Sequence, residues 1–328
     1  MPDHTTLIEI FSRFSTDDAC YNYFEKLRWP EGVYCPKCGK DRISKITSSS
    51  KKQTVRRLYE CLNPECGHQF TATAGTIFHD THLPIRKWFI AVALMCNAKK
   101  GVSAKQMERD LGVSYRTAWY LNHRIRKAMQ QGEGLLTGTI ETDETYVGGK
   151  YDRRRHRERY QKQPVMGLLQ RGADTSASKI QAMPIPTNSR AVLVGIVNNR
   201  VSREAELVCT DELAAYSSLK GAYNHQTVNH IKLEYVSAAD PRVHTNSIEN
   251  FWSLFKRGLI GSFHRVSIKH LQRYLDEFTF RFNNRDQQGQ MFALVVMLLL
   301  AGIAMPYETL VNSTEPATFS PPASDEPF

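Results

Sequence analysis

Four of the seven cysteines form two close pairs, and this arrangement constrains the fold of the N-terminal part more than any other feature. The pairs are Cys35 and Cys38 in CPKCG and Cys61 and Cys66 in CLNPECG, with 22 residues between them. Such spacings suit a tetrahedral zinc site, although the second pair is wider than usual and His68 could replace Cys66. A segment this short cannot bury a sufficient core of its own. We therefore predict a zinc ribbon over residues 31–80, held folded by structural Zn²⁺.

The rest of the composition is typical of a folded protein with a polyanionic partner. The formal net charge is +10 and 41% of the 328 residues are hydrophobic. The start of the chain lacks the pattern of a signal peptide, so we expect the paired cysteines to work in a reducing cytoplasm. Cys20, Cys96 and Cys209 then serve as small apolar fillers. The apolar run 291–305 is too short to span a membrane, which predicts a buried core helix and no membrane partner.

A DNA-binding element next to the zinc ribbon is predicted in residues 81–132. Within VSAKQMERDLGVSYRTAWYLNHRIRKAM, a first helix over 103–110 ends near Gly112, and Ser114 begins a second, basic helix. In a helix-turn-helix the second helix enters the major groove of DNA. An ordinary helical hairpin with a basic face is the alternative. The candidate DNA contacts of the second helix are Ser114, Tyr115, Arg116, Thr117, Arg124, Arg126 and Lys127.

Two aspartates occur in repeats of the tripeptide TDE. Asp143 lies in ETDETYVGG, which is typical of a strand that leads to a Gly-Gly turn, and Asp211 ends a short apolar strand in CTDELAAY. Ligands of α/β sheets collect beyond the carboxyl ends of strands, so Asp211 is well placed for a site. Taken singly, each aspartate is more often a turn former or a helix cap.

The segment VHTNSIENFWSLFKRG, residues 243–258, supplies a third acid. Glu249 and Lys256 are seven residues apart, so two helical turns place them on one face, beside an apolar surface that includes Trp252. An exposed helix with a solvated charge stripe is the alternative. Together with Asp143 and Asp211, Glu249 suggests three carboxylates that share two Mg²⁺ or Mn²⁺ ions, as in metal-assisted phosphoryl transfer.

The basic segment KYDRRRHRERYQK follows the first of these strands. It carries seven Lys/Arg against two acids, and it is either a solvated loop or a tract that follows the DNA backbone. Its candidate contacts are Arg153, Arg154 and Arg155, and Arg257 is a further candidate beside Lys256, which would meet a phosphate as a point charge.

These motifs resemble those of bacterial insertion-sequence transposases of the DDE type with an N-terminal zinc ribbon, the ISXO-like group. The matching pieces are CPKCG, GTIFH, ETDETYVGGK, CTDELAAY, VNH, HTNSIENFWSLFKRGLIGSFHRVS and HLQRYLDEFTFRFNNR, which lie in order over roughly residues 30–290. The resemblance implies an α/β fold with a ribonuclease-H-like catalytic domain, the acids Asp143, Asp211 and Glu249, and Mg²⁺-dependent cutting and joining of DNA. Some relatives use Asn as the third ligand, which makes Asn246 the alternative to Glu249.

The expected organisation and function follow from these motifs. The predicted regions are a helical lead-in (1–30), the zinc ribbon (31–80), the helix-turn-helix region (81–132), the catalytic domain (137–310) and a disordered tail (311–328). The predicted partners are the double-stranded ends of a transposon and its target, with a homo-oligomer holding two ends in a nucleoid-associated bacterial complex. Two other functions stay open: a DNA-binding regulator without catalysis, and a nuclease that cuts but does not join.

Four more side chains could lie near the predicted catalytic site. Glu144 and Glu212 each follow a candidate aspartate and could support the metal ligands from beside them. For His230 and His244 a structural role is at least as strong an expectation. In HLQRYLDEFTFRFNN, the helical spacing of Leu271, Leu275, Phe278 and Phe282 predicts packing against the sheet and not a base-stacking surface.

Overall fold

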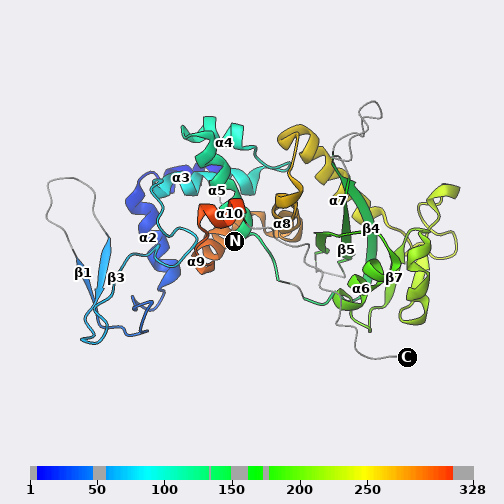
Figure 1. The fold of residues 1–328 in the computed structure, drawn as a ribbon, viewed down its shortest axis with the longest axis horizontal. Coiled ribbons are helices and arrows are strands. Elements are labelled where there is room, and N and C mark those ends of the chain that lie inside the picture. The colour runs from blue at the N-terminus through cyan, green and yellow to red at the C-terminus, as the bar shows by residue number, and fades with distance from the viewer. Residues whose placement is uncertain (1–5, 47–56, 133, 149–161, 173–176, 313–328) are drawn as a thin grey trace. The chain divides into compact units, whose positions relative to one another are not determined.

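The chain forms two compact units in the computed structural model (Figure 1). Unit 1 contains Met1–Met129 and Gln287–Ser313, and unit 2 contains Gln130–Asp286. The structure describes residues 6–46, 57–132, 134–148, 162–172 and 177–312. The predicted tail comprises residues 311–328, and its part from Ser313 onward lies outside the described residues.

Unit 1 combines a small sheet with a group of helices. The sheet has the strand order β1-β2-β3, and both pairings are antiparallel. The elements of unit 1 are α1 (Leu7–Arg13), α2 (Asp17–Arg28), β1 (Ile43–Ile46), β2 (Leu58–Cys61), β3 (Gln69–Phe70), α3 (Ile85–Asn97), α4 (Ala104–Leu111), α5 (Tyr115–Ala128), α9 (Gln288–Ala301) and α10 (Tyr307–Asn312).

Helix α9 lies in the core of unit 1. Its Phe292 ring is 5.6 Å from the ring of Phe14 and 5.5 Å from that of Phe89, measured between centroids. A helix that is apolar on all sides needs partners on several sides, and α2, α3 and α5 supply them. The apolar run is therefore a core helix, as expected. Helix α9 packs with the N-terminal elements, however, and not with the catalytic domain, for which the sequence predicts the range 137–310.

Among the described residues, no helix has both the length and the apolar character that crossing a bilayer requires.

Helices α4 and α5 pack against each other across a tight turn. Gly112 ends α4 with φ of 56°, a left-handed conformation that glycine adopts without strain. The hydroxyl of Ser114 accepts a hydrogen bond from the backbone N–H of Thr117 and so caps α5. The two turn residues that we identified in the sequence therefore have the expected local roles.

Unit 2 is built on a mixed sheet with the order β6-β5-β4-β7-β8. Strand β4 pairs antiparallel with β5, and β5 with β6, whereas β4–β7 and β7–β8 are parallel pairs. Its elements are β4 (Thr139–Val147), β5 (Gln163–Gln170), β6 (Lys179–Pro184), α6 (Arg190–Arg200), β7 (Leu207–Thr210), η2 (Ala214–Gly221), β8 (His225–Thr227), η3 (His230–Lys232), α7 (Asn246–Gly258), the π-helical turn η4 (Leu259–Phe263), η5 (Ile268–His270) and α8 (Leu271–Asn283), with η6 (Arg285–Gln287) at its end.

Alternation along the strands divides the core of unit 2 between the two faces of the sheet. Ile140 and Met166 belong to a cluster with residues of α6 and η2, whereas Val147 and Val165 belong to a cluster with residues of α7 and α8. The predicted apolar face of α8 packs in the second cluster, which confirms the expectation of core packing. Helices therefore cover both faces of the sheet.

Helix α7 approaches the sheet at a glycine. Gly167 of β5 pairs with Asp143 of β4, and a Cβ atom at Gly167 would lie 2.6 Å from Cζ2 of Trp252 and 3.0 Å from Cδ1 of Ile248. The apolar face of α7 is buried here, so the helix is not the exposed charged helix of the alternative interpretation. Because Gly167 has no side chain, the helix that carries Glu249 lies directly against the strand position beside Asp143.

We predict that Gly167→Ala destabilises unit 2 by about 1–3 kcal/mol, because the new methyl group pushes α7 away from the sheet. Thermal or urea unfolding measures this loss. Gly221→Ala is the control, since a Cβ atom there meets no atom within 4 Å. Equal stabilities for the two variants would contradict the close packing at Gly167.

Candidate functional site

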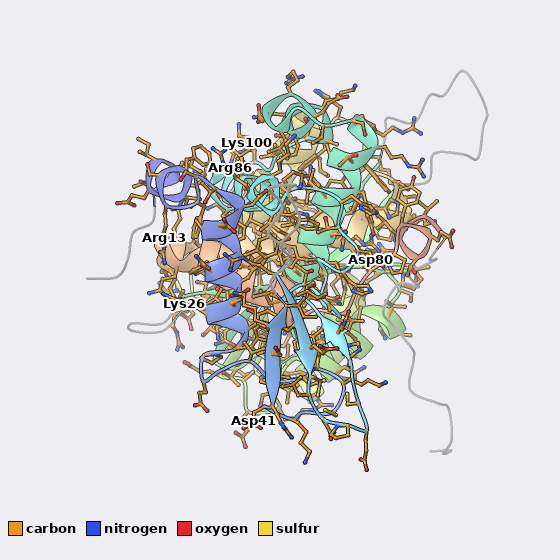
Figure 2. All side chains as sticks on the ribbon, turned by 90° about the vertical axis from the view of Figure 1, so that its left-hand side faces the viewer. Arg13, Lys26, Asp41, Asp80, Arg86 and Lys100 are labelled. Atoms are coloured by element: carbon orange, nitrogen blue, oxygen red, sulfur yellow. The ribbon has the colours of Figure 1, made fainter. Side chains whose placement is uncertain are left out.

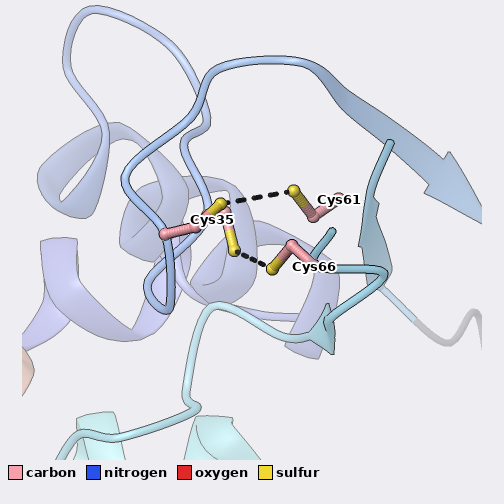
Figure 3. Close-up of side chains that lie close together, drawn as sticks. Cys35, Cys61 and Cys66 are labelled. Carbon is pink, nitrogen blue, oxygen red and sulfur yellow. Dashed lines mark hydrogen bonds between the residues drawn. The ribbon is translucent and has the colours of Figure 1, made fainter. Parts of the chain in front are cut away.

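The four paired cysteines converge in unit 1. Their sulfur atoms all lie within 4.8 Å of one another, with Cys35 and Cys66 separated by 3.8 Å and Cys38 and Cys61 by 3.6 Å (Figure 3). With a Zn–S bond of about 2.3 Å, a tetrahedral site requires sulfur–sulfur distances of about 3.8 Å. The geometry therefore fits a structural zinc ion. His68 is not in this group and stacks on Phe70, so the alternative ligand is wrong.

The glycine after each cysteine pair has a conformational role. Gly39 and Gly67 adopt φ of 73° and 53°, and their N–H groups donate to the carbonyls of Cys35 and Asn63. These left-handed residues close the two turns that carry the sulfurs. The backbone N–H of Lys40 lowers the pKa of the Cys38 thiol to about 7, whereas, against the backbone N–H of Asn63, desolvation and the neighbouring thiols raise the pKa of Cys61 to about 12. Four thiolates so close together need a cation such as zinc beside them.

Unit 2 brings three carboxylates together. Oxygen atoms of Asp143, Glu144 and Asp211 lie within 4.8 Å of one another. Strand β4 pairs with β7 only up to Glu141, opposite Cys209, so the next residues of β4 have a strand partner on the β5 side alone. Asp211 follows the last residue of β7, at the carboxyl end of that strand. The acids therefore meet where the two parallel strands part.

Glu249 lies close to this group from helix α7. Its charge contributes to the raised pKa values of both Asp143 and Asp211, although it is not one of the three clustered acids. Its Oε1 accepts a hydrogen bond of 2.7 Å from Oγ1 of Thr245 and lies 3.2 Å from Nε2 of His230. The structure thus brings all three predicted acids into one region, with Glu249 at its edge.

Glu144 is more central than the sequence indicated. Alternation along β4 directs it to the face opposite Asp143, where its Oε1 accepts a hydrogen bond from the buried Tyr216 hydroxyl. Its carboxylate nevertheless reaches the cluster, because β4 has no strand partner on the β7 side at this level. Strand alternation alone could not reveal this, since it depends on where β7 ends.

The clustered acids oppose one another's ionisation. Burial, then the charges of Glu144, Asp211 and Glu249, raises the pKa of Asp143 to about 7. Burial and Asp211 likewise raise the pKa of Glu144 to about 7, and burial raises that of Asp211. Such a group is stable as a set of anions only with cations beside it, so it can hold divalent metal.

The remaining predicted side chains surround the acids. Glu212 accepts a hydrogen bond from the backbone N–H of His230 and so supports the loop of that histidine. His244 lies 3.4 Å from Glu141, a buried acid of β4 to which the sequence analysis gave no role. Asn246 is exposed at the start of α7.

Comparison with known protein families agrees with these two centres. A model of the ISXO2-like transposase domain matches residues 135–283, and a model of the transposase zinc-ribbon domain matches residues 15–69. The chain therefore contains an ISXO2-like transposase domain and a transposase zinc-ribbon domain. The domain match ends near the end of α8, which agrees with the assignment of α9 to unit 1.

Two curated proteins are similar to this chain. One is an uncharacterized protein in transposable element ISH50 of Halobacterium salinarum, 29% identical over 285 residues, which are 82% of this chain and 91% of the relative. The other is an uncharacterized transposase-like protein of Haemophilus influenzae, 29% identical over 117 residues, or 35% of this chain and 90% of the relative.

The start of α5 keeps its predicted DNA-contact residues accessible. Ser114, Tyr115 and Arg116 are exposed, and Thr117 is partly exposed. The Arg116 guanidinium stacks 4.3 Å from the ring centroid of Tyr307, so part of its surface is covered. These residues remain candidates for base contact.

Two arginines further along α5 do not fit the prediction. Arg124 is buried and stacks on Trp88 and Tyr120, at 4.9 and 5.0 Å from their ring centroids. Arg126 is 2% exposed. The basic pattern of α5 predicted DNA contact for both arginines. That prediction is wrong because arginine stems and guanidinium planes also pack against aromatic rings. Lys127 keeps partial exposure.

Other basic residues offer accessible charge. Lys256 and Arg257 are exposed in the last turn of α7, where Arg257 also donates to the Ser253 carbonyl. Figure 2 shows further charged side chains of unit 1, among which the basic residues Arg13, Lys26, Arg86 and Lys100 are all exposed. The predicted contacts Arg153, Arg154 and Arg155 lie outside the described residues.

We predict that Cys61→Ser removes the zinc ion and unfolds the ribbon, because three sulfurs leave the tetrahedron incomplete. Zinc content by atomic absorption should fall from about one ion per chain to much less. Cys20→Ala is the control. Cys20 is buried but lies outside the cluster, so this variant should keep the zinc ion. Full zinc content in Cys61→Ser would refute the assignment.

A pH prediction follows from the buried acids. A folded-state pKa of about 7 for Asp143 means that the folded chain binds more protons than the unfolded chain between about pH 4 and 7. Stability without added divalent metal should therefore fall as the pH rises through this window. Asp143→Asn should be more stable than the native chain at pH 8, on the order of 4 kcal/mol, and equally stable at pH 4. A constant difference across the pH range in thermal unfolding would contradict this.

Proposed function

We propose that the chain is a DNA transposase that binds the ends of an insertion sequence and catalyses phosphodiester cleavage and strand transfer with divalent metal. The observation that carries this proposal is the meeting of Asp143 and Asp211, at the parting of two parallel strands, with Glu249 close by from α7. The two family matches give the reaction its context.

The catalytic unit is proposed to be ribonuclease-H-like. Its three antiparallel strands continue into two parallel ones, and helices cover both faces of the sheet. Asp143 lies on the central strand β4, and Asp211 directly follows its parallel neighbour β7, at the carboxyl end where ligands of α/β sheets bind.

The proposed ligands of two Mg²⁺ or Mn²⁺ ions are Asp143, Asp211 and Glu249. Bound metal would activate the attacking oxygen and stabilise the leaving one. In the first reaction, water attacks the scissile phosphorus, the bond to the 3′ oxygen breaks and that oxygen takes up a proton. In the second, this 3′-hydroxyl loses its proton and attacks a phosphodiester of the target, whose own 3′ oxygen leaves. The role of the three acids would be to hold the metal ions, which would supply the charge that both reactions need.

Glu249 is the better-supported third ligand. Its charge acts on both aspartates, and its Oε1 is held by Thr245. Asn246 lies one helical turn earlier and is exposed. A carboxylate also offers Mg²⁺ a formal charge that an amide lacks.

Recognition of the ends is proposed for unit 1. The zinc ribbon and the α4–α5 pair, as a helix-turn-helix, would read terminal repeats through Ser114 to Thr117. Lys256 and Arg257 would contact backbone phosphates near the acids. Because strand transfer joins two ends to one target, we expect a homo-oligomer on DNA, in association with the nucleoid.

We predict that Asp143→Ala and Asp211→Ala each lower cleavage of a labelled transposon end by about 1,000-fold or more, since each removes a metal ligand. Binding of the same DNA should remain within a few-fold in a gel-shift measurement. Glu204→Ala is the matched control, an exposed acid of unit 2 that should cleave normally. Of Glu249→Gln and Asn246→Ala, the first should lose far more activity.

The products separate the competing functions. Joined products in Mg²⁺ support a transposase, nicked DNA without joining supports a nuclease, and binding without any cut supports a regulator. Normal cleavage by Asp143→Ala would end the assignment of the site.

A further inference from the structure

We propose that Glu141 is a positioning residue that fixes the start of α7 on strand β4 and thereby sets Glu249 beside Asp143. This inference rests on the proposed function, since it concerns the same acids. It assigns a role to a carboxylate that does not itself join the acidic cluster.

Glu141 makes the direct connection between strand and helix. It lies two residues before Asp143 on the same face of β4, and it is completely buried. Its Oε2 accepts hydrogen bonds of 2.9 Å from the backbone N–H groups of both Ser247 and Ile248. The carboxylate therefore binds two of the free N–H groups that every helix has at its start.

This capping replaces one that the helix lacks. Thr245 occupies the N-cap position of α7 but makes no side-chain capping bond. Its hydroxyl instead donates to Glu249 and lies 3.1 Å from Nε2 of His230. The strand thus supplies the cap, with its negative charge at the positive end of the helix dipole, while Thr245 remains engaged with the proposed metal ligand.

Arg171 fixes the segment that leads into the helix. Its Nε donates to Oε1 of Glu141 at 2.6 Å, and its Nη2 donates to the carbonyl of His244 at 2.7 Å. Its Nη1 donates to the carbonyl of Arg242. One guanidinium therefore neutralises the buried acid and holds the chain immediately before Thr245.

The network connects three segments that are distant in the sequence, and together they position Glu249. From Glu141 the contacts lead through Arg171 to His244, and the next residue, Thr245, orients the carboxylate of Glu249. A proposed metal ligand held this way keeps its carboxylate in one position, close enough for its charge to act on both aspartates. Metal affinity then depends on Glu141 although this residue donates no oxygen to the metal.

Only a carboxylate of this length satisfies all three donors. In Glu141→Gln, the side-chain oxygen can accept either from the backbone N–H groups at the start of α7 or from Arg171. The NH₂ group then faces the remaining donors, to which it cannot bond. The start of α7 should loosen while the remaining apolar contacts of the helix persist. If Glu141 only stabilised the fold, Glu141→Gln would lower the melting temperature without a specific effect on metal binding.

The test compares Glu141→Gln with Glu277→Gln in the full-length protein. Glu277 is also completely buried and is paired with Arg281, but it lies on α8. We measure Mn²⁺ binding by calorimetry and backbone hydrogen exchange of α7 and α8. For Glu141→Gln we expect Mn²⁺ affinity to fall by about 10- to 100-fold, with faster exchange at Ser247 and Ile248. Cleavage should recover in part at high Mn²⁺, which a lost ligand would not allow.

Two outcomes would overturn the inference. One is Glu141→Gln with native Mn²⁺ affinity and native exchange at Ser247 and Ile248. The other is Glu277→Gln with an equal loss of Mn²⁺ affinity. If Glu141→Gln does not fold, Arg171→Lys serves in its place, since it keeps the charge and loses the fork, and the same two measurements decide. A native chain that binds no Mn²⁺ and cuts no DNA would instead refute the proposed function.

Discussion

The mutual repulsion of buried carboxylates is the constraint on which the arrangement of unit 2 depends. Acids on β4 and after β7 are partly shielded from water and close to one another, which raises the pKa values of Asp143 and Glu144 to about 7. A protein tolerates such a cost where cations complete the site. The surrounding framework must therefore hold the acids in place by means other than their own attraction.

That framework consists of a close packing contact and a buried ion pair. Gly167 lets the apolar face of α7 lie against the sheet, and Glu141 with Arg171 holds the first turn of the same helix. The glycine limits the distance between helix and strand, whereas the ion pair limits sliding and rotation. Glu249 takes its position from both.

Local sequence patterns predicted much of this structure. The contacts between distant segments could not be predicted from such patterns. The cysteine spacing, the turn at Gly112, the cap at Ser114 and the apolar face of α7 follow from periodicity and backbone preference. The place of Glu144 depends on where β7 stops, and the role of Glu141 depends on amides more than 100 residues away. Arg124 was misjudged because a basic helix pattern does not distinguish solvent from an aromatic partner.

The return of the chain from unit 2 into unit 1 affects how the protein is made. Phe292 and its neighbours on α9 complete a core whose other members include Phe14 and Phe89, more than 200 residues earlier in the chain. The ribosome must therefore synthesise the whole catalytic unit before the N-terminal unit can close its core. A chain cut short after Glu249 would contain every proposed metal ligand, but without α9 the core of its N-terminal unit would stay incomplete.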